Sequence, residues 1–187
     1  MAMLSRAALE AMGFAALGQN VMISDRVSIY NAGRVSIGNN VRIDDFCVLS
    51  AGKGGISIGD YVHIAAFCSL VGAGAIRLSS FCGLSSRVSI YSSSDDYSGA
   101  TLTNPTVPSQ YTGVRSEDVT LEKHVIVGCG SVILPGVTIS EGAAIGALSL
   151  VQKNCEPFSI YSGVPAKLMK ARKQDLLELE HKLLAVS

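Results

Sequence analysis

The sequence has no tryptophan, few aromatic residues and no excess of charge of either sign. Its 15 acidic residues balance 15 basic ones, whereas proteins that bind nucleic acid usually carry a basic excess. It has no run of 18 apolar residues, so no membrane-spanning helix is expected. The apolar N-terminal segment contains Arg6 and Glu10 and lacks the uninterrupted core of a signal peptide. We therefore expect a cytoplasmic protein that does not bind nucleic acid.

The five cysteines are an odd number and include no Cys-x-x-Cys pair. A disulfide framework and a structural zinc site are therefore not expected. Four of these cysteines, Cys47, Cys68, Cys82 and Cys155, instead fit a repeat that runs through most of the chain.

Aliphatic residues recur at every sixth position, and this repeat is the strongest pattern in the chain. The repeated positions are Leu17, Ile23, Ile29, Ile37, Ile43, Leu49, Ile58, Ile64, Leu70, Leu78, Leu84, Ile90, Leu121, Val127, Ile133, Ile139, Ile145 and Val151. The fourth residue after each is usually small or β-branched, and the four cysteines named above occupy this position. A period of six fits a short strand and a corner, with one large and one small residue directed inward.

The hexads group in threes, which predicts triangular turns that stack at the spacing of parallel strands, about 4.8 Å. We predict an all-β fold, a parallel β-helix of six turns over residues 17–165 that is interrupted by an inserted loop at 91–118. Residues 1–16 are expected to cap the first turn, as a solenoid requires. Residues 166–187 are expected to form a C-terminal helix whose Leu176, Leu179 and Leu183 share one face. That face either seals the last turn or packs on a neighbouring molecule.

Several segments carry a resemblance to a known family. They read VGCGSVILPGV from Val127, IGALS from Ile145, GVPAK from Gly163, IDDFC from Ile43 and DDYSG from Asp95. Together they resemble the hexapeptide-repeat acetyltransferases, which include galactoside, maltose and xenobiotic acetyltransferases, and most closely a branch associated with polysaccharide gene clusters. The resemblance implies a left-handed parallel β-helix, a homotrimer with active sites at its interfaces, acetyl-CoA as the donor, no metal, and direct acetyl transfer.

The insertion from Tyr91 to Asp118 is a candidate acceptor site, because loops of this length inside a compact repeat are uncommon unless they are functional. It carries Asp95, Asp96, Tyr97 and Asn104, whose polar groups are able to hold a sugar. Packing of a solvated loop against a neighbouring subunit is the alternative explanation.

The general base is the point at which the chain departs from the family. Galactoside-type relatives have a His early in this loop, and Asp95 stands there instead. Asp95 and Asp96 are candidates, although an ordinary carboxyl pKa near 3.9 makes a weak base for a hydroxyl. His63 is better matched to neutral pH and is expected to meet Asp95 across a trimer interface. A structural hydrogen bond is the alternative role for His63.

The donor is expected over the last two turns. The resemblance places Cys129 where a backbone N–H faces the thioester oxygen, and Gly146 and Ala147 would let the pantetheine arm approach the backbone. Phosphates of CoA are expected to meet a group of basic residues near the C-terminus, namely Lys153, Lys167, Lys170 and Arg172. A purely solubilising role for these residues is the alternative.

The main functional expectation is transfer of the acetyl group of acetyl-CoA to a sugar hydroxyl in surface polysaccharide or lipopolysaccharide biosynthesis. The alternative is N-acetylation of a nucleotide-linked amino sugar, because an amine of low pKa makes less demand on a strong base. A non-catalytic β-helix scaffold is a further alternative. A γ-type carbonic anhydrase shares the fold but needs three His ligands for its metal, which His63, His124 and His181 do not supply at close spacing.

Overall fold

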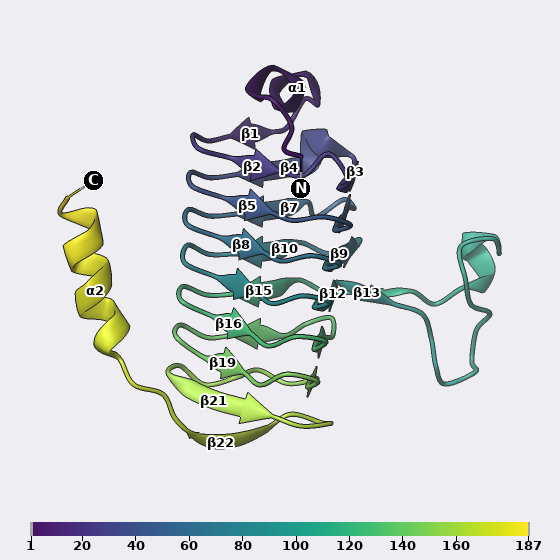
Figure 1. Ribbon diagram of the computed structural model, residues 1–187. Helices are drawn as coiled ribbons and strands as arrows, with labels where there is room; N and C mark the ends of the chain where they lie inside the picture. The colour runs from purple at the N-terminus through teal and green to yellow at the C-terminus, as the bar shows by residue number, and fades with distance from the viewer. Residues whose placement is uncertain (1, 187) are drawn as a thin grey trace.

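The chain forms a triangular parallel β-helix with a small cap at its N-terminal end and a C-terminal helix along its side (Figure 1). The computed structural model describes residues 2–186. The cap contains α1 (Arg6–Ala11), which Ser5 begins by accepting a hydrogen bond from the backbone N–H of Ala8. Met1 and Ser187, at the ends of the predicted cap and C-terminal segment, lie outside the described residues.

Three parallel sheets form the sides of the triangle. The first contains β1 (Ala16–Leu17), β4 (Val35–Ile37), β7 (Ile56–Ile58), β10 (Ile76–Leu78), β15 (Val119–Leu121) and β18 (Thr138–Ile139). The second contains β2 (Met22–Ile23), β5 (Arg42–Ile43), β8 (His63–Ile64), β11 (Gly83–Leu84), β16 (Ile126–Val127), β19 (Ala144–Ile145) and β21 (Ser159–Ser162). The third contains β3 (Ser28–Tyr30), β6 (Val48–Ala51), β9 (Ser69–Gly72), β12 (Ser89–Tyr91), β17 (Val132–Ile133) and β20 (Leu150–Val151).

The aliphatic repeat forms the core. Every predicted inward position is buried except Leu17 and Ile29, which are partly exposed near the N-terminal end. The cysteines that share the small inward position are also buried, and burial raises the pKa of the Cys82 thiol to about 12. These four thiols therefore act as small core side chains, and the predicted left-handed β-helix is confirmed.

The C-terminal end differs from the prediction in two ways. Cys155 bridges to Ile139, and β21 pairs with β19, so a seventh turn begins after the six that were predicted. The prediction of helix from residue 166 was wrong for its first part: β22 (Lys167–Ala171) is a strand that pairs antiparallel with β21. An open sheet edge offers unpaired N–H and C=O groups, and the returning chain pairs with them.

Helix α2 (Asp175–Leu184) lies beside the β-helix and does not seal its last turn (Figure 1). Its buried residue is Glu180, whereas Leu179 and Leu183 of the predicted apolar face are exposed. Glu180 accepts a hydrogen bond from Nε2 of His124 at 2.7 Å and pairs with Lys123. Burial opposes ionisation of Glu180, but these hydrogen bonds outweigh it and lower its pKa. Polar contacts therefore hold α2 against the fifth turn.

The predicted insertion leaves the β-helix as an arm after β12 (Figure 1). Strands β13 (Ser93–Ser94) and β14 (Arg115–Ser116) pair antiparallel at its base, and a short 3-10 helix, η2 (Ser109–Tyr111), lies within it. A second 3-10 helix, η1 (Ala32–Arg34), forms a corner near the N-terminal end. In the part of the chain from residue 2 to residue 186, no helix is long and apolar enough to cross a membrane.

Candidate active site

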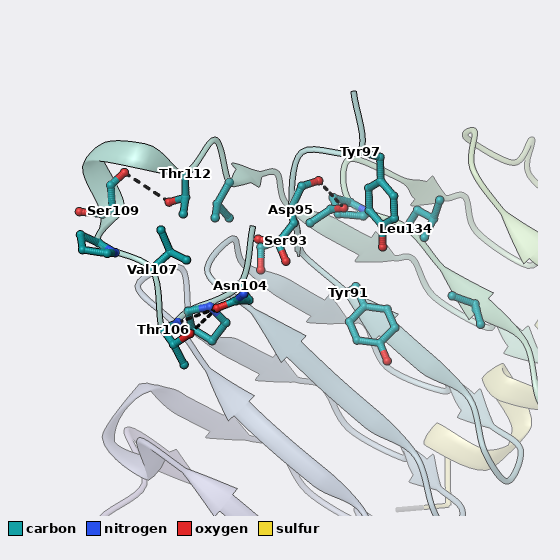
Figure 2. A pocket seen from close by; sticks show the side chains of 16 residues that line it. Tyr91, Ser93, Asp95, Tyr97, Asn104, Thr106, Val107, Ser109, Thr112 and Leu134 are labelled. Carbon is teal, nitrogen blue, oxygen red and sulfur yellow. Dashed lines mark hydrogen bonds between the residues drawn. The ribbon is translucent and has the colours of Figure 1, made fainter. Parts of the chain in front are cut away.

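A pocket of about 980 Å³ lies between the arm and the third sheet, and we call it the arm pocket (Figure 2). Its lining comes from the sheet and from the arm: Tyr91, Val132, Leu134 and Pro135 on the sheet side, and Ser93, Ser94, Asp95, Tyr97, Asn104, Pro105, Thr106, Val107, Pro108, Ser109, Thr112 and Val114 on the arm side. The volume is at the upper end of the range for small-molecule sites. The pocket is therefore large enough to hold a small-molecule ligand.

Three of the predicted acceptor residues line the arm pocket. Asp95 is exposed, and Figure 2 shows it near Tyr97, which is 93% exposed, on the side toward Leu134. Asn104 lies toward the other side, where its Oδ1 accepts hydrogen bonds from the backbone and hydroxyl of Thr106 at 3.0 and 2.6 Å. An exposed tyrosine ring beside a carboxylate gives an amphipathic surface of the kind that binds sugars.

Asp96 has a different environment from that of Asp95. Its carboxylate accepts hydrogen bonds from the backbone N–H of Ser98 at 2.8 Å and from Thr101 at 3.0 and 3.1 Å. These hydrogen bonds, from Ser98 first and then Thr101, lower the pKa of Asp96 to about 2. A carboxylate held in this way shapes the arm and is a poor proton acceptor near neutral pH, which argues for Asp95 over Asp96.

His63 lies on the outer face of β8 and belongs to a network that the sequence analysis did not assemble. Its Nε2 is 2.9 Å from Oδ2 of Asp44, and the other carboxylate oxygen of Asp44 accepts a hydrogen bond from Nε of Arg42 at 2.7 Å. Burial opposes ionisation of Asp44, but the hydrogen bonds from Arg42 and His63 outweigh it and lower its pKa. The imidazole is thus oriented by an ionised carboxylate.

The spacing of this network contained a signal that could have found it. His63 pairs in register with Arg42 on the neighbouring strand, one turn of the β-helix earlier, and Asp44 follows Arg42 by two residues. In the first four turns, residues 20 or 21 positions apart are stacked neighbours. The segment from Ile43 to Cys47 was noted only for its family resemblance.

A second pocket, of about 320 Å³, opens beside His63 on the outside of the second sheet. We call it the sheet pocket, and its lining residues are His63, Ala65, Gly83, Leu84, Ser85, Ser86 and Ile126. The imidazole of His63, which is 51% exposed, therefore borders a site that contains hydroxyl groups and a half-exposed isoleucine. The sheet pocket and the arm pocket share no lining residue.

Within one chain, His63 and Asp95 are not brought together. His63 lies on the second sheet in the third turn, whereas Asp95 follows the third sheet in the fourth turn and faces the arm pocket. The carboxylate that orients the imidazole is Asp44, not Asp95. The expected meeting of His63 with Asp95 thus stays a prediction about two different chains.

The predicted donor residues lie on the last turns. Cys129 is exposed, and its backbone C=O accepts a hydrogen bond from the N–H of Leu148. Packing within the chain by itself favours glycine at position 146, because a Cβ there would lie 2.7 Å from Oγ of Ser162. Ala147 is exposed next to it. A role for these residues in binding pantetheine remains a prediction.

The basic residues divide into two groups. Lys153, Lys167 and Lys170 are exposed, the last two on β22, and their ammonium groups are available to an anion. Arg172 is partly buried, and its Nη1 donates hydrogen bonds to the carbonyl oxygens of His124 and Gly142 at 2.9 and 2.8 Å. Burial lowers the pKa of Arg172. Its guanidinium fastens the segment after β22 to the β-helix, so the lysines are the better candidates for phosphate contacts.

The sequence and the fold of this chain were compared with those of known proteins. No family model matches the chain. Over 180 residues the chain is 55% identical to the dTDP-4-amino-4,6-dideoxy-D-glucose acyltransferase of Escherichia coli, a match that spans 96% of this chain and 94% of that enzyme. This chain belongs to the hexapeptide-repeat acyltransferase family.

Solved structures of acyltransferases agree with this assignment. AntD, an N-acyltransferase from Bacillus cereus, was crystallised as a variant with dTDP-4-amino-4,6-dideoxyglucose and coenzyme A; it is 45% identical, has a TM-score of 0.96, and the match covers 100% of this chain and 99% of AntD. Another AntD complex contains dTDP and 3-hydroxybutyryl-CoA. A maltose O-acetyltransferase from Clostridium difficile 630 has a TM-score of 0.61 at 18% identity, which shows the shared fold alone.

Proposed function

We propose that this acyltransferase moves an acyl group from a coenzyme A thioester to the amino group of a dTDP-linked 4-amino-4,6-dideoxyhexose. The observation that carries the proposal is the 55% identity over nearly the whole length of both chains to an enzyme that acts on such a nucleotide. The finding favours the alternative expectation, N-acylation, over O-acetylation of a sugar hydroxyl. The CoA-containing complexes of AntD support the coenzyme A thioester as co-substrate.

The chemistry of an amine acceptor fits the residues that are present. The neutral amine attacks the thioester carbonyl, the new C–N bond forms, and the C–S bond breaks to release coenzyme A. One amine proton must leave, and the departing thiolate takes up a proton. A neutral amine is already a nucleophile, so the base has only to remove the proton that attack makes acidic. A carboxylate or an imidazole can do this near neutral pH.

The AntD structures also point to residues that merit attention in this chain. They include variants at one serine and variants at one aspartate ten positions further along. Ser85 and Asp95 have this spacing here, and they line the sheet pocket and the arm pocket, respectively. Ser86 and Asp96 have the same spacing, but the carboxylate of Asp96 is already occupied by Ser98 and Thr101.

We further propose that the active unit is a homotrimer in which the arm of one chain covers the sheet pocket of its neighbour. Asp95 would then face the network of His63 and Asp44. In this arrangement one of the two groups holds the acceptor amine while the other removes its proton. The prediction that His63 is the base, with Asp95 orienting the imidazole or the acceptor, is retained with Asp44 as an additional orienting group.

The donor is proposed to bind over the turns that carry Cys129, Gly146 and Ala147. A backbone N–H near Cys129 would stabilise the negative charge that develops on the thioester oxygen. The exposed lysines Lys153, Lys167 and Lys170 would meet the phosphates of coenzyme A. Among residues 2–186, no group of three or more His, Cys, Asp or Glu side chains is arranged to hold a metal ion, and the proposed chemistry requires none.

The test compares acceptors directly. The purified protein is incubated with acetyl-CoA and either dTDP-4-amino-4,6-dideoxyglucose or a neutral sugar such as maltose, and thiol release and product mass are followed. We expect turnover with the amino sugar and a product heavier by one acetyl group that resists mild alkali, as an amide does and an ester does not. Turnover confined to hydroxyl acceptors would reject the proposal. Failure to bind coenzyme A would instead support the scaffold alternative.

A further inference from the structure

Gly83 lines the sheet pocket and lies on the outer face of β11. Its neighbour Leu84 points into the core, so the position of Gly83 faces outward. The row of outward positions on the second sheet runs Met22, Arg42, His63, Gly83, Ile126, Ala144 and Ile160, each paired in register with the next. Gly83 interrupts this row of side chains between His63 and Ile126.

Neither the backbone nor the packing of the chain explains this glycine. Its φ is not in the left-handed region, where glycine is favoured. A Cβ added at Gly83 would lie 3.9 Å from Cγ1 of Ile126, an ordinary contact, with no other nonadjacent described residue within 4 Å. Gly128 is different, because a Cβ there would lie 2.4 Å from the backbone nitrogen of Ala147.

A glycine inside a strand weakens it and often marks a place that a ligand approaches closely. The absent side chain leaves Ile126 45% exposed and opens the pocket next to the imidazole of His63. The lining combines apolar residues, Ala65, Gly83 and Ile126, with polar ones, His63, Ser85 and Ser86.

We infer that Gly83 determines acceptor specificity, because the space where its side chain would be receives the sugar ring of the acceptor. This inference rests on the proposed function. A 6-deoxy amino sugar carries an apolar methyl group together with polar amine and hydroxyl groups, which suits a lining that mixes apolar and polar residues. The volume of about 320 Å³ is at the lower end for ligand sites, as expected for one ring and not for a complete nucleotide. The donor, in contrast, is proposed to bind over the next two turns, which carry Cys129, Gly146 and Ala147.

The experiment adds side chains to the pocket in two steps. Gly83→Ala and Gly83→Val are compared with the wild type and with Gly33→Ala, a matched control. Gly33 is an exposed glycine in η1 whose added Cβ meets only the backbone oxygen of Gly13 at 3.6 Å. For each protein, kcat/KM for the amino-sugar nucleotide, KM for acetyl-CoA, the Kd of dTDP, the melting temperature and the molecular mass by sedimentation are measured.

We expect kcat/KM for the acceptor to fall on the order of 10- to 200-fold, more for Val than for Ala, since a single methylene in a binding pocket has effects of this size. KM for acetyl-CoA, the Kd of dTDP and the molecular mass should stay within about twofold of wild type, and the melting temperature should not fall. Gly33→Ala should match the wild type throughout.

Three results would overturn the inference. Full acceptor activity of Gly83→Val would mean that no ligand enters the space. An equal loss of dTDP or acetyl-CoA binding would assign the pocket to another part of a substrate, and a change in molecular mass would assign it to a neighbouring chain. Failure of the proposed function is separately visible, because the wild type itself would then not acylate the amino-sugar nucleotide.

Discussion

Replacement of Asp44 by Asn tests whether His63 is a catalytic base, because it alters the imidazole without touching it. In the wild type each oxygen of Asp44 has its own donor, Arg42 at 2.7 Å and His63 at 2.9 Å. An asparagine keeps the shape but has only one oxygen and one NH₂ group. If the oxygen stays with Arg42, the NH₂ group faces Nε2 of His63, which must then accept a hydrogen bond. The other ring nitrogen must carry the proton and can no longer remove one from the acceptor.

The expected loss of activity follows from the proposed role of His63 as a general base. General-base catalysis typically contributes 10²- to 10⁴-fold, which corresponds to about 2.7–5.4 kcal/mol in the barrier. We expect Asp44→Asn and His63→Ala each to lower kcat/KM for the amino-sugar nucleotide by an amount in this range. The double variant should lose little more than His63→Ala alone, since the two residues act as one unit.

The assay is thiol release across a range of pH, with the oligomeric mass and the Kd of coenzyme A measured for every variant. The pKa of Asp44 is lowered, so its charge is present throughout the neutral range and its loss should affect the rate at every pH in that range. Asp60→Asn is the matched control: the Oδ1 of Asp60 accepts a hydrogen bond from the backbone of Asn39 outside both pockets, and an asparagine oxygen can replace it. If Asp44→Asn and His63→Ala both keep more than about a third of wild-type activity, far above the range for a base, His63 is structural and Asp95 is the base to examine.

Three further predictions concern the core, the donor and the C-terminal helix. Ile64→Asp should prevent folding, because a fully buried position would receive an unpaired charge; circular dichroism and sedimentation would detect a folded variant that contradicts the inward register. Lys167→Glu combined with Lys170→Glu should weaken acetyl-CoA binding by about 1.5–3 kcal/mol and dephospho-acetyl-CoA binding much less, whereas equal losses would exclude contact with the 3′-phosphate. The folded pKa of Glu180 is lowered from 4.5, so the stabilisation that its charge gives to the docked α2 is present above pH 4.5 and is lost as the pH falls through the lowered pKa. Limited proteolysis of α2 in the wild type should therefore become faster in acid. The rate for Glu180→Gln should depend much less on pH.

The fold was predictable because the core of a β-helix places the same demand on every turn. A residue such as Ile64 has a similar neighbour in the turn before and in the turn after, Ile43 and Leu84. Each turn therefore checks the inward register that is assigned to the others. The C-terminal strand β22 was missed for the opposite reason. Its sequence, KLMKA, has the composition of a helix, and only the open edge of β21 makes it a strand. Pairing with that edge overrides local propensity.

The sequence singled out candidate residues for the site, but it did not show how they are connected. Asp95 and Asp96 are adjacent and of the same type, and only the arm's conformation shows that Asp96 is occupied by Ser98 and Thr101. Arg172 was grouped with the exposed lysines because the sequence cannot tell where the chain turns back against the carbonyl groups of the fifth and sixth turns. These distinctions depend on contacts between segments far apart in sequence.

The proposed sharing of a site between two subunits leads to a prediction that a mixture of two variants can test. One chain holds two separate pockets, the arm pocket with Asp95 and the sheet pocket with His63. If a complete site needs Asp95 from one subunit and His63 from the next, then His63→Ala and Asp95→Asn trimers are each inactive, but a mixed trimer contains interfaces at which both residues are intact. With random equimolar mixing, the subunit that supplies Asp95 to an interface has it intact in half of the cases, and the subunit that supplies His63 likewise. About a quarter of the interfaces should therefore contain both intact residues.

Activity of about a quarter of wild type should therefore appear when the two variants are co-expressed or refolded together, although neither is active alone. Mixing the already assembled proteins without exchange of subunits should leave them inactive and serves as the control. A co-expressed sample that gives only the sum of the two residual activities would mean that His63 and Asp95 do not act in one shared site. A stable and fully active monomer would contradict the trimer itself, and with it the reason that two such distant residues belong to the same reaction.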